Sequence, residues 1–236
     1  PPPPPPTPPP PRPPTPPPRL LRRQRQMCIR DRYIEMLEQG VASSPEKEQE
    51  YLAVLTRESG RLSILINNVL ELARLEKKTR RFNMQKNSIS SVFSEIASTM
   101  EQNLKQEGFS LDIEDTSVED LVFDREVLIQ ILMNLIENSI KFGRNSAVKR
   151  ITLGAEIRSG FVDITVSDTG PGIPKKELYK VFDDFYRVDN SLAPATGGTG
   201  LGLALVKKFV TAMGGRVSAD NNKEGGCAIT ISLPAT

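Results

Sequence analysis

Hydrophobic side chains at alternating spacings of three and four mark a long helix over residues 45–78. Ser44 suits the N-cap position, and Pro45 and Glu46 suit the first helical turn. The spacing forms a heptad seam made of Leu52, Leu55, Ser59, Leu62, Ile66, Val69 and Ala73. We predict that the seam packs against partner helices in a dimeric bundle of helical hairpins. A single amphipathic helix on a globular core is the alternative.

The pattern changes to mixed α/β from residue 82 onward. Three segments have helical periodicity. The first stops at Gly108 and has an apolar face made of Ile89, Val92, Phe93, Ile96, Met100 and Leu104. The second runs from Asp124 to about Phe142, and the third covers 200–213. Strand patterns occupy 82–86, 109–114, 120–123, 150–158, 161–167, 216–220 and 227–233. This order predicts an α/β two-layer sandwich, a mixed sheet with helices on one face, preceded by the long helix of a helical hairpin.

The first 32 residues differ in composition from the rest of the chain. Residues 1–18 contain fifteen prolines, which exclude a helix or a central strand and favour disorder or polyproline II. Residues 19–32 carry six arginines, and the string MCIRDR at 27–32 resembles translated sequencing adapter. We interpret residues 1–32 as a disordered Pro/Arg-rich leader that is not native and has no function. A ligand for a proline-binding module is the alternative.

Charge and cysteine usage narrow the functional class. The net charge is +2, but the leader alone holds seven arginines and one aspartate, so the remainder is mildly acidic and nucleic acid is not the expected partner. The two cysteines, Cys28 and Cys227, fit neither a disulfide framework nor a zinc site. No apolar run of about 18 residues is present, so we expect no membrane contact from this fragment. We expect a cytoplasmic location, and a membrane anchor in the full-length protein stays open.

The sequence contains no histidine. This excludes histidine as a general acid or base, as a metal ligand and as a phosphorylation site within the chain. Any chemistry therefore depends on carboxylates, amides, lysines and the backbone.

A polar stripe lies on the predicted helix at 124–142. Asn134, Asn138 and Lys141 occupy positions i, i+4 and i+7, so they share one face. An amide oxygen is a hard ligand suited to Mg²⁺, and a lysine adds a point charge for phosphate. The alternative is an ordinary exposed polar face.

A glycine segment follows the strand at 161–167. Asp168 begins the sequence DTGPGIP, in which Gly170 and Gly172 let the backbone approach a ligand without a side-chain clash. The aspartate can accept a hydrogen bond from an exocyclic amine. An ordinary Asp-Thr-Gly turn that closes a strand explains this segment equally well.

A second glycine segment, GGTGLGLALV, opens the predicted helix at 200–213. Unpaired backbone N–H groups and the helix dipole favour an anion there, so Gly197, Gly198, Gly200 and Gly202 predict a phosphate cradle. Between the two glycine segments lies the polar stretch FDDFYRVDNSLAPAT. We predict a mobile lid at 182–196, with Phe182 and Phe185 as anchors and Arg187 as a phosphate contact.

Four segments in this order resemble the N, G1, F and G2 boxes of bacterial sensor histidine kinases. They are NLIENSIKF at 134–142, DTGPGI at 168–173, FDDFYRVD at 182–189 and GGTGLGL at 197–203. The resemblance implies that residues 82–236 are an ATP-binding catalytic domain that holds ATP and Mg²⁺ between the N-box helix and the lid.

The same resemblance assigns roles to individual residues. Asn138 would coordinate Mg²⁺ and Lys141 would meet phosphate; Asp168 would bind the adenine amino group, with Phe142 against the base. The full set implied to bind the nucleotide is Asn134, Asn138, Lys141, Phe142, Asp168, Gly170, Gly172, Arg187, Gly198, Thr199, Gly200, Leu201 and Gly202. Related ATPases of this fold place a glutamate four residues before the metal-binding asparagine. Asn134 occupies that position here, and because an amide cannot act as a general base, a kinase is favoured over an ATPase.

Residues 33–80 resemble part of the dimerisation and phosphotransfer hairpin of these kinases, namely the end of the first helix at 33–40 and the whole second helix. The histidine box is expected just upstream of Tyr33, where proline and arginine stand instead. The full-length homodimeric kinase would transfer phosphate from ATP to histidine and then to an aspartate of a response regulator receiver domain, but we expect no autophosphorylation of this chain. The alternatives are a nucleotide-dependent interaction module without catalysis and a serine kinase of the anti-sigma type. The helix at 45–78 counts against the serine kinase.

Overall fold

The computed structural model describes Met36 and residues 44–114, 118, 120–188, 199–223 and 225–235. The chain divides into two compact units, residues 1–64 and 65–236. Residues 1–32 lie outside the described residues, and so does the predicted helix at 33–40 except for Met36, which is helical. The predicted division into 1–32, 33–80 and 82–236 therefore stays a prediction.

The long helix α2 runs from Pro45 to Glu76. It begins where Ser44 Oγ accepts a hydrogen bond from Lys47 N at 3.4 Å, as the N-cap prediction required. It ends two residues earlier than predicted because Lys78 adopts a left-handed backbone with φ of 53°. The described residues leave much of its heptad seam uncovered, since Leu52, Leu62, Ile66 and Val69 are exposed. Among the described residues, no helix is both long and apolar enough to cross a bilayer.

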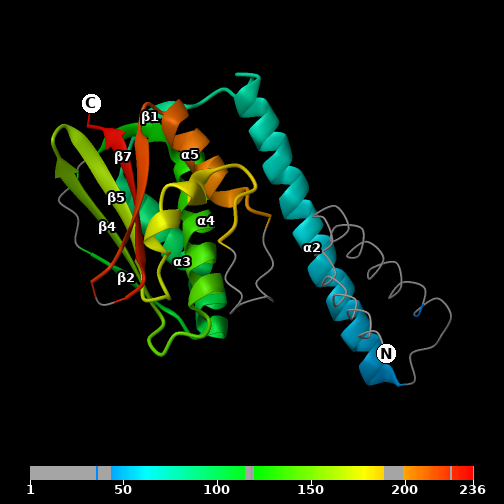
Figure 1. Ribbon diagram of the computed structural model, residues 1–236. Helices are drawn as coiled ribbons and strands as arrows, with labels where there is room; N and C mark the ends of the chain where they lie inside the picture. Colours follow the sequence, from blue (N-terminus) through cyan, green and yellow to red (C-terminus); the bar gives the residue numbers. More distant parts are fainter. Residues whose placement is uncertain are drawn as a thin grey trace, which may run out of the picture. The chain divides into compact units, whose positions relative to one another are not determined.

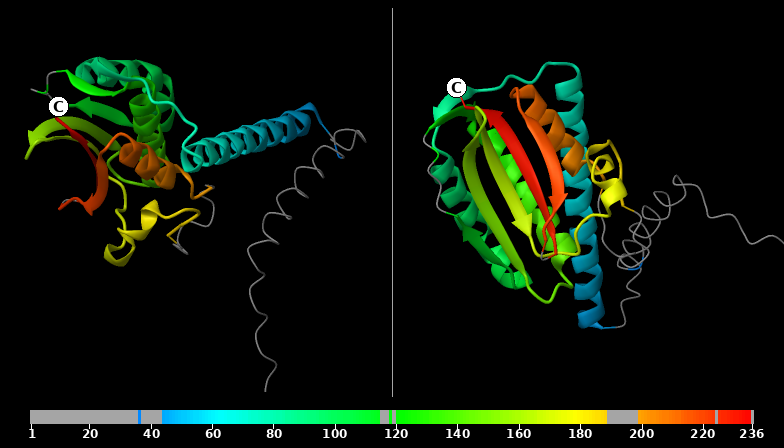
Figure 2. Two further views of the ribbon diagram at one scale, coloured as in Figure 1. Left: turned by 90° about the horizontal axis from the view of Figure 1, so that it is seen from above. Right: turned by 60° about the vertical axis from the view of Figure 1, so that its left-hand side comes forward.

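A five-stranded mixed sheet forms the centre of residues 65–236. Its order is β2-β4-β5-β7-β6; β2 is parallel to β4 and the other neighbours are antiparallel. The strands are β2 (Ser110–Ile113), β4 (Arg150–Arg158), β5 (Phe161–Asp168), β6 (Arg216–Asn221) and β7 (Cys227–Pro234). Helices α3 (Ile89–Glu107), α4 (Arg125–Gly143) and α5 (Gly202–Ala212) cover one face of this sheet (Figures 1 and 2). The predicted two-layer α/β fold with a preceding long helix is confirmed.

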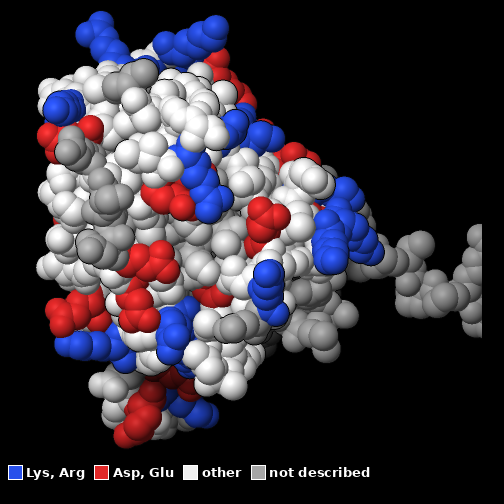
Figure 3. Space-filling model, turned by 90° about the vertical axis from the view of Figure 1, so that its left-hand side faces the viewer, with Lys and Arg blue, Asp and Glu red and all other residues white. Residues whose placement is uncertain are grey.

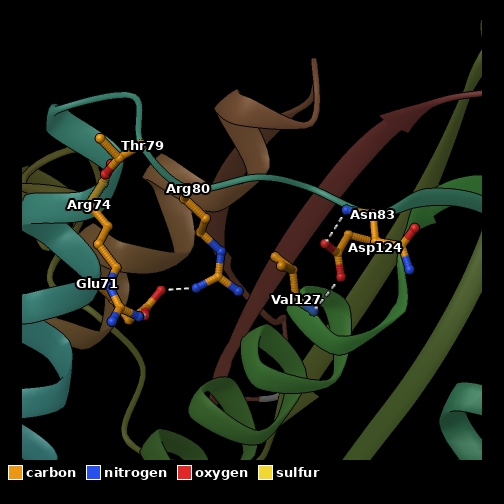
Figure 4. Close-up of polar contacts among 7 residues, drawn as sticks. All are labelled: Glu71, Arg74, Thr79, Arg80, Asn83, Asp124 and Val127. Carbon is orange, nitrogen blue, oxygen red and sulfur yellow. Dashed lines mark hydrogen bonds and ion pairs between the residues drawn. The ribbon is translucent and has the colours of Figure 1, made fainter.

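The prediction of a single sheet was wrong. Strands β1 (Met84–Asn87) and β3 (Leu121–Asp124) form a separate antiparallel pair. The physical reason lies in Asp124, whose carboxylate caps α4 by accepting from Val127 N at 3.1 Å and also accepts from Asn83 N at 2.8 Å (Figure 4). This residue fixes the end of β3 to the residue before β1, so the two short strands pair with each other.

The core follows the predicted periodicity. All six residues of the predicted apolar face of α3 are buried, and the glycine predicted to stop it, Gly108, is its left-handed C-cap with φ of 74°. In β5 the alternate residues Val162, Ile164 and Val166 are buried under the helices. The opposite face of the sheet is polar: Thr165 and Thr230 hydrogen bond to each other there at 3.1 Å, and charges of both signs are interspersed over this side (Figure 3).

Arg80 connects the end of α2 to α5 within residues 65–236. Its guanidinium forms an ion pair with the Glu71 carboxylate on α2 (Figure 4) and lies 4.8 Å from the centroid of the Phe209 ring on α5. Lys208 of α5 makes a second connection, with its Nζ 2.9 Å from Glu76 Oε1. A cavity of about 580 Å³ lies beside these contacts, and none of the predicted nucleotide-binding residues lines it.

Candidate functional site

The polar stripe of α4 joins the start of α5. Asn138 Nδ2 donates to Asn134 Oδ1 at 3.2 Å, and Asn134 Nδ2 donates to the Gly202 carbonyl at 3.4 Å. Both asparagines are half-buried and share a helix face, as the i, i+4 spacing predicted. Two predicted segments 68 residues apart in sequence therefore meet.

The carboxylate of Asp168 is held by three protein groups at the end of β5. Oδ2 accepts from Ser139 Oγ of α4 at 3.1 Å. Oδ1 accepts from Gly170 N at 2.8 Å and from Cys227 N, the first residue of β7, at 3.2 Å. The carboxylate is thus fixed in orientation by α4, its own loop and β7.

Burial, and after it the negative charge of the nearby Asp168 carboxylate, raise the pKa of the Cys227 thiol to about 12. Sequence reasoning did not find Ser139 or Cys227 as neighbours of the site. The signal for Ser139 was weak: it is a polar residue on the apolar side of α4, four residues after the buried Leu135.

The second glycine segment packs on the predicted lid. Thr199, Gly200 and Leu201 precede α5, which begins at Gly202 rather than at residue 200; Gly197 and Gly198 lie outside the described residues. Gly200 has φ of 74°, and a Cβ added there would lie 2.8 Å from both Phe185 C and Tyr186 O. Only glycine fits this approach without displacing backbone. Leu201 is buried, and Thr199 Oγ1 accepts a hydrogen bond from the Leu201 amide at 3.3 Å. Among the described residues, no side chain caps the start of α5.

Comparisons of the sequence and of the fold with known proteins identify relatives of this chain. A sequence profile of the "Histidine kinase-, DNA gyrase B-, and HSP90-like ATPase" family matches residues 123–236. Sensor histidine kinase WalK of Bacillus subtilis is 33% identical over 203 residues, which are 86% of this chain and 33% of that protein. Sensor protein kinase WalK of Staphylococcus aureus is 32% identical over 204 residues, 86% of this chain and 48% of that protein.

The chain carries the ATPase catalytic domain of the histidine kinases. It spans about a third to a half of the length of these curated relatives. Full-length ShkA, solved in complex with AMPPNP, is 27% identical to this chain and has a TM-score of 0.67. The match covers 81% of this chain and 39% of the ShkA chain. Histidine kinase ThkA, solved in complex with response regulator protein TrrA, matches in fold with a TM-score of 0.73 at 21% identity. This match covers 92% of this chain and 60% of the ThkA chain.

Two short 3-10 helices, η1 (Lys175–Glu177) and η2 (Lys180–Phe182), precede the predicted lid of this histidine kinase domain, and η2 ends at the first lid residue. Phe182 is buried, as predicted for an anchor. The prediction that Phe185 is also an anchor was wrong, because its side chain is 48% exposed. Phe185 has a left-handed backbone with φ of 61°, and it is the backbone of this turn that lies against Gly200. Arg187 is exposed, and residues 189–196 of the predicted lid lie outside the described residues.

The C-terminal end of α4 presents two further predicted residues of the histidine kinase site. Phe142 is 53% exposed, and Lys141 Nζ lies 4.7 Å from the centroid of its ring. Gly143, the next residue, has Gly170 Cα 4.0 Å from the position that its Cβ would take. The end of the helix therefore adjoins the loop that carries Asp168.

Proposed function

We propose that this chain binds ATP with Mg²⁺ and is the catalytic part of a sensor histidine kinase. The observation that carries the proposal is the hydrogen-bonded connection of three segments. Asn134 of α4 reaches the start of α5 and accepts a hydrogen bond from Asn138, and Ser139 of α4 reaches Asp168. These contacts join the N-box helix to the carboxylate and to the phosphate-cradle segment.

Asp168 fits the role of base recognition. Its Oδ2 accepts one hydrogen bond, from Ser139, so a lone pair remains for the 6-amino group of adenine. Phe142 would lie against the base from the end of α4, where its ring is exposed. The Gly170–Gly172 loop would allow the base to approach the backbone.

Asn138 fits the role of metal ligand. Its Nδ2 donates to Asn134, and within the described residues its Oδ1 accepts no hydrogen bond, which leaves a hard oxygen for Mg²⁺. In the same part of the chain no cluster of three or more Cys, Asp or Glu side chains could hold a metal. The donor set therefore fits a metal bound by one amide oxygen and by the phosphates, with Lys141, Arg187 and the 198–202 segment contacting those phosphates.

The γ-phosphoryl group of bound ATP would be transferred to a histidine and then to an aspartate of a response regulator. This chain would position the nucleotide and stabilise its charge without supplying a general base, because Asn134 is an amide. Its 236 residues contain no histidine, so the acceptor must lie outside them. We expect the chain alone not to autophosphorylate.

The proposal extends to the partners and the location of the full-length protein. A response regulator is supported by ThkA, a kinase of the same fold solved with TrrA. A homodimer is supported by the exposed seam of α2 and a cytoplasmic location by the cysteine usage. The seam also counts against a serine kinase of the anti-sigma type.

A titration with ATP in Mg²⁺, comparing the parent chain with Asp168→Asn, tests the binding. We expect saturable binding that weakens at least tenfold in the variant, because the amide would present a donor or a weaker acceptor to the adenine amine. No binding by the parent would contradict the proposal. Radiolabel from γ-labelled ATP, offered with a separate histidine-bearing hairpin, then distinguishes a kinase from a nucleotide-dependent interaction module, which would leave the hairpin unlabelled.

A further inference from the structure

The turn between β6 and β7 supports the loop that carries Asp168. Asn222, directly after β6, donates from Nδ2 to the Asp168 carbonyl at 2.9 Å and to Ser167 Oγ at 2.9 Å. This one amide group therefore holds the backbone at the residue whose carboxylate is proposed to read the base.

The preceding residue holds the other end of the same loop. Asn221 Oδ1 accepts from Ile173 N at 2.8 Å, and Asn221 Nδ2 donates to the Ile173 carbonyl at 2.6 Å. Gly172, next to Ile173, has φ of 73°, and a Cβ added there would lie 2.8 Å from Asn221 Oδ1. Two consecutive asparagines thus fasten residues 168–173 at the first and the last residue.

The turn also supplies a direct contact to the carboxylate. Asn222 N donates to the Gly226 carbonyl at 3.0 Å, which closes the turn and places Cys227 N 3.2 Å from Asp168 Oδ1. Gly226 has φ of 89° and packs so closely on the Asp168 carbonyl that a Cβ would overlap it. The side chain and the backbone of Asp168 are therefore both held by the 221–227 turn, which is far in sequence from the N-box helix.

We propose that Asn222 is a positioning residue for base recognition, and that Asn221 assists it by fixing the far end of the loop. The inference rests on the proposed ATP binding. A carboxylate favours a base with an exocyclic amine over a base without one only if its free lone pair points at the amine. The reason is that a hydrogen bond weakens steeply as its angle departs from linear. The hydrogen bonds from Asn138 to Asn134 and from Asn134 to Gly202 of α5 do not involve the turn, so the phosphate end of the site does not depend on Asn222.

The test compares two nucleotides in the full chain: ATP, and the analogue that carries hydrogen in place of the 6-amino group. Dissociation constants are measured by calorimetry in Mg²⁺ for the parent, Asn222→Ala, Asn221→Ala and the control Lys223→Ala. Lys223 lies in the same turn with an exposed side chain, and it makes none of the described contacts with the loop. Asn222→Ser is a milder second variant in case Asn222→Ala fails to fold, which circular dichroism would reveal.

We expect Asn222→Ala to weaken ATP binding about tenfold and binding of the analogue less than twofold, so the preference for ATP falls. Asn221→Ala should show a smaller fall and Lys223→Ala none. Equal weakening of both nucleotides, as from a purely structural role, or an unchanged preference would overturn the inference while leaving the ATP site standing. A parent that binds neither nucleotide, or binds both equally, would overturn the proposed base recognition by Asp168 and this inference with it.

Discussion

Ser139 Oγ donates a hydrogen bond to Asp168 Oδ2 at 3.1 Å and thereby ties α4 to the end of β5. The serine is buried and stands immediately after Asn138, the proposed metal ligand. The two ends of the proposed nucleotide site, base and metal, are consequently set by adjacent residues of one rigid helix. A displacement of α4 would change both ends together.

Substitution of Ser139 by alanine should weaken ATP binding without unfolding the domain. The change removes one of three hydrogen bonds that orient Asp168, which corresponds to about 1 kcal/mol, or roughly fivefold in the dissociation constant. Calorimetric titration with ATP measures it. Ser94→Ala is the matched control, since the Ser94 hydroxyl donates to the Ser90 carbonyl within α3 and its side chain is exposed. Equal affinities of Ser139→Ala and the parent would show that Asp168 needs no support from α4.

The destabilising effect of a side chain at the close approach to Gly200 can be measured separately from the effect of the left-handed backbone at that residue. Gly200→Ala should destabilise the protein more than Gly160→Ala, although both glycines have positive φ, 74° and 79°. At Gly160 a Cβ meets nothing within 4 Å, so only the cost of the left-handed backbone applies, about 1 kcal/mol. At Gly200 the backbone of 185–186 must also move, and we expect about 1–2 kcal/mol more. Urea unfolding of both variants measures the difference, and equal losses would contradict the packing of Gly200 on the lid.

The ion pair of Arg80 with Glu71 should contribute to the stability of residues 65–236. The two side chains are only 19% and 14% exposed, and Arg80 also lies over the ring of Phe209. Arg80→Met should therefore cost about 1–3 kcal/mol in the free energy of unfolding, because it leaves the Glu71 carboxylate half-buried with the more exposed Arg74 as its remaining partner.

A double-mutant cycle with Glu71→Gln tests this attribution. If the ion pair is the cause, Arg80→Met should cost less in the Glu71→Gln background than in the parent. Urea unfolding at low and at moderate salt measures both costs. Strictly additive losses would assign the effect of Arg80 to its packing on Phe209 instead.

The raised pKa of Cys227 predicts a loss of stability at alkaline pH. The ordinary pKa of the thiol is 9.0 and its pKa in the folded protein is about 12. A folded-state pKa above the unfolded one favours folding below pH 9, and this contribution is lost as the pH rises from 9 toward 12. At pH 10 the loss is about 1 kcal/mol relative to pH 8.

Urea unfolding of Cys28→Ser and of Cys28→Ser with Cys227→Ala, at pH 8 and pH 10 under reducing conditions, measures this loss. The Cys28→Ser background leaves Cys227 as the single thiol. We expect the difference between the two proteins to shrink as the pH rises. If the difference in unfolding free energy between the two proteins does not change with pH, the environment of the Cys227 thiol is more polar than its burial beside Asp168 implies.

Local sequence patterns were sufficient for most elements of the fold. The apolar face of α3, its stop at Gly108 and the alternation of β5 follow from side-chain periods of 3.6 and 2, which each segment carries by itself. The shared face of Asn134 and Asn138 is likewise a property of one helix. These features could be predicted because no distant residue decides them.

Pairings between distant segments could not be predicted in the same way. The separate β1–β3 sheet depends on Asp124 accepting from both Val127 and Asn83, and the exposure of Phe185 depends on a turn that presents its backbone to Gly200. The support of Asp168 by Ser139, Asn222 and Cys227 joins α4, β5 and the β6–β7 turn across 29, 54 and 59 residues of sequence.

The sequence by itself therefore determined the helices, the strands, the fold class and the order of the four motifs, because each rests on local periodicity or on neighbouring residue types. Only the tertiary structure decided which polar groups hold the carboxylate of Asp168 and which glycine contacts the lid. Those contacts form when the pairing of the strands and the packing of the helices bring distant segments within hydrogen-bond distance. The periodicity of a single segment contains no information about such contacts.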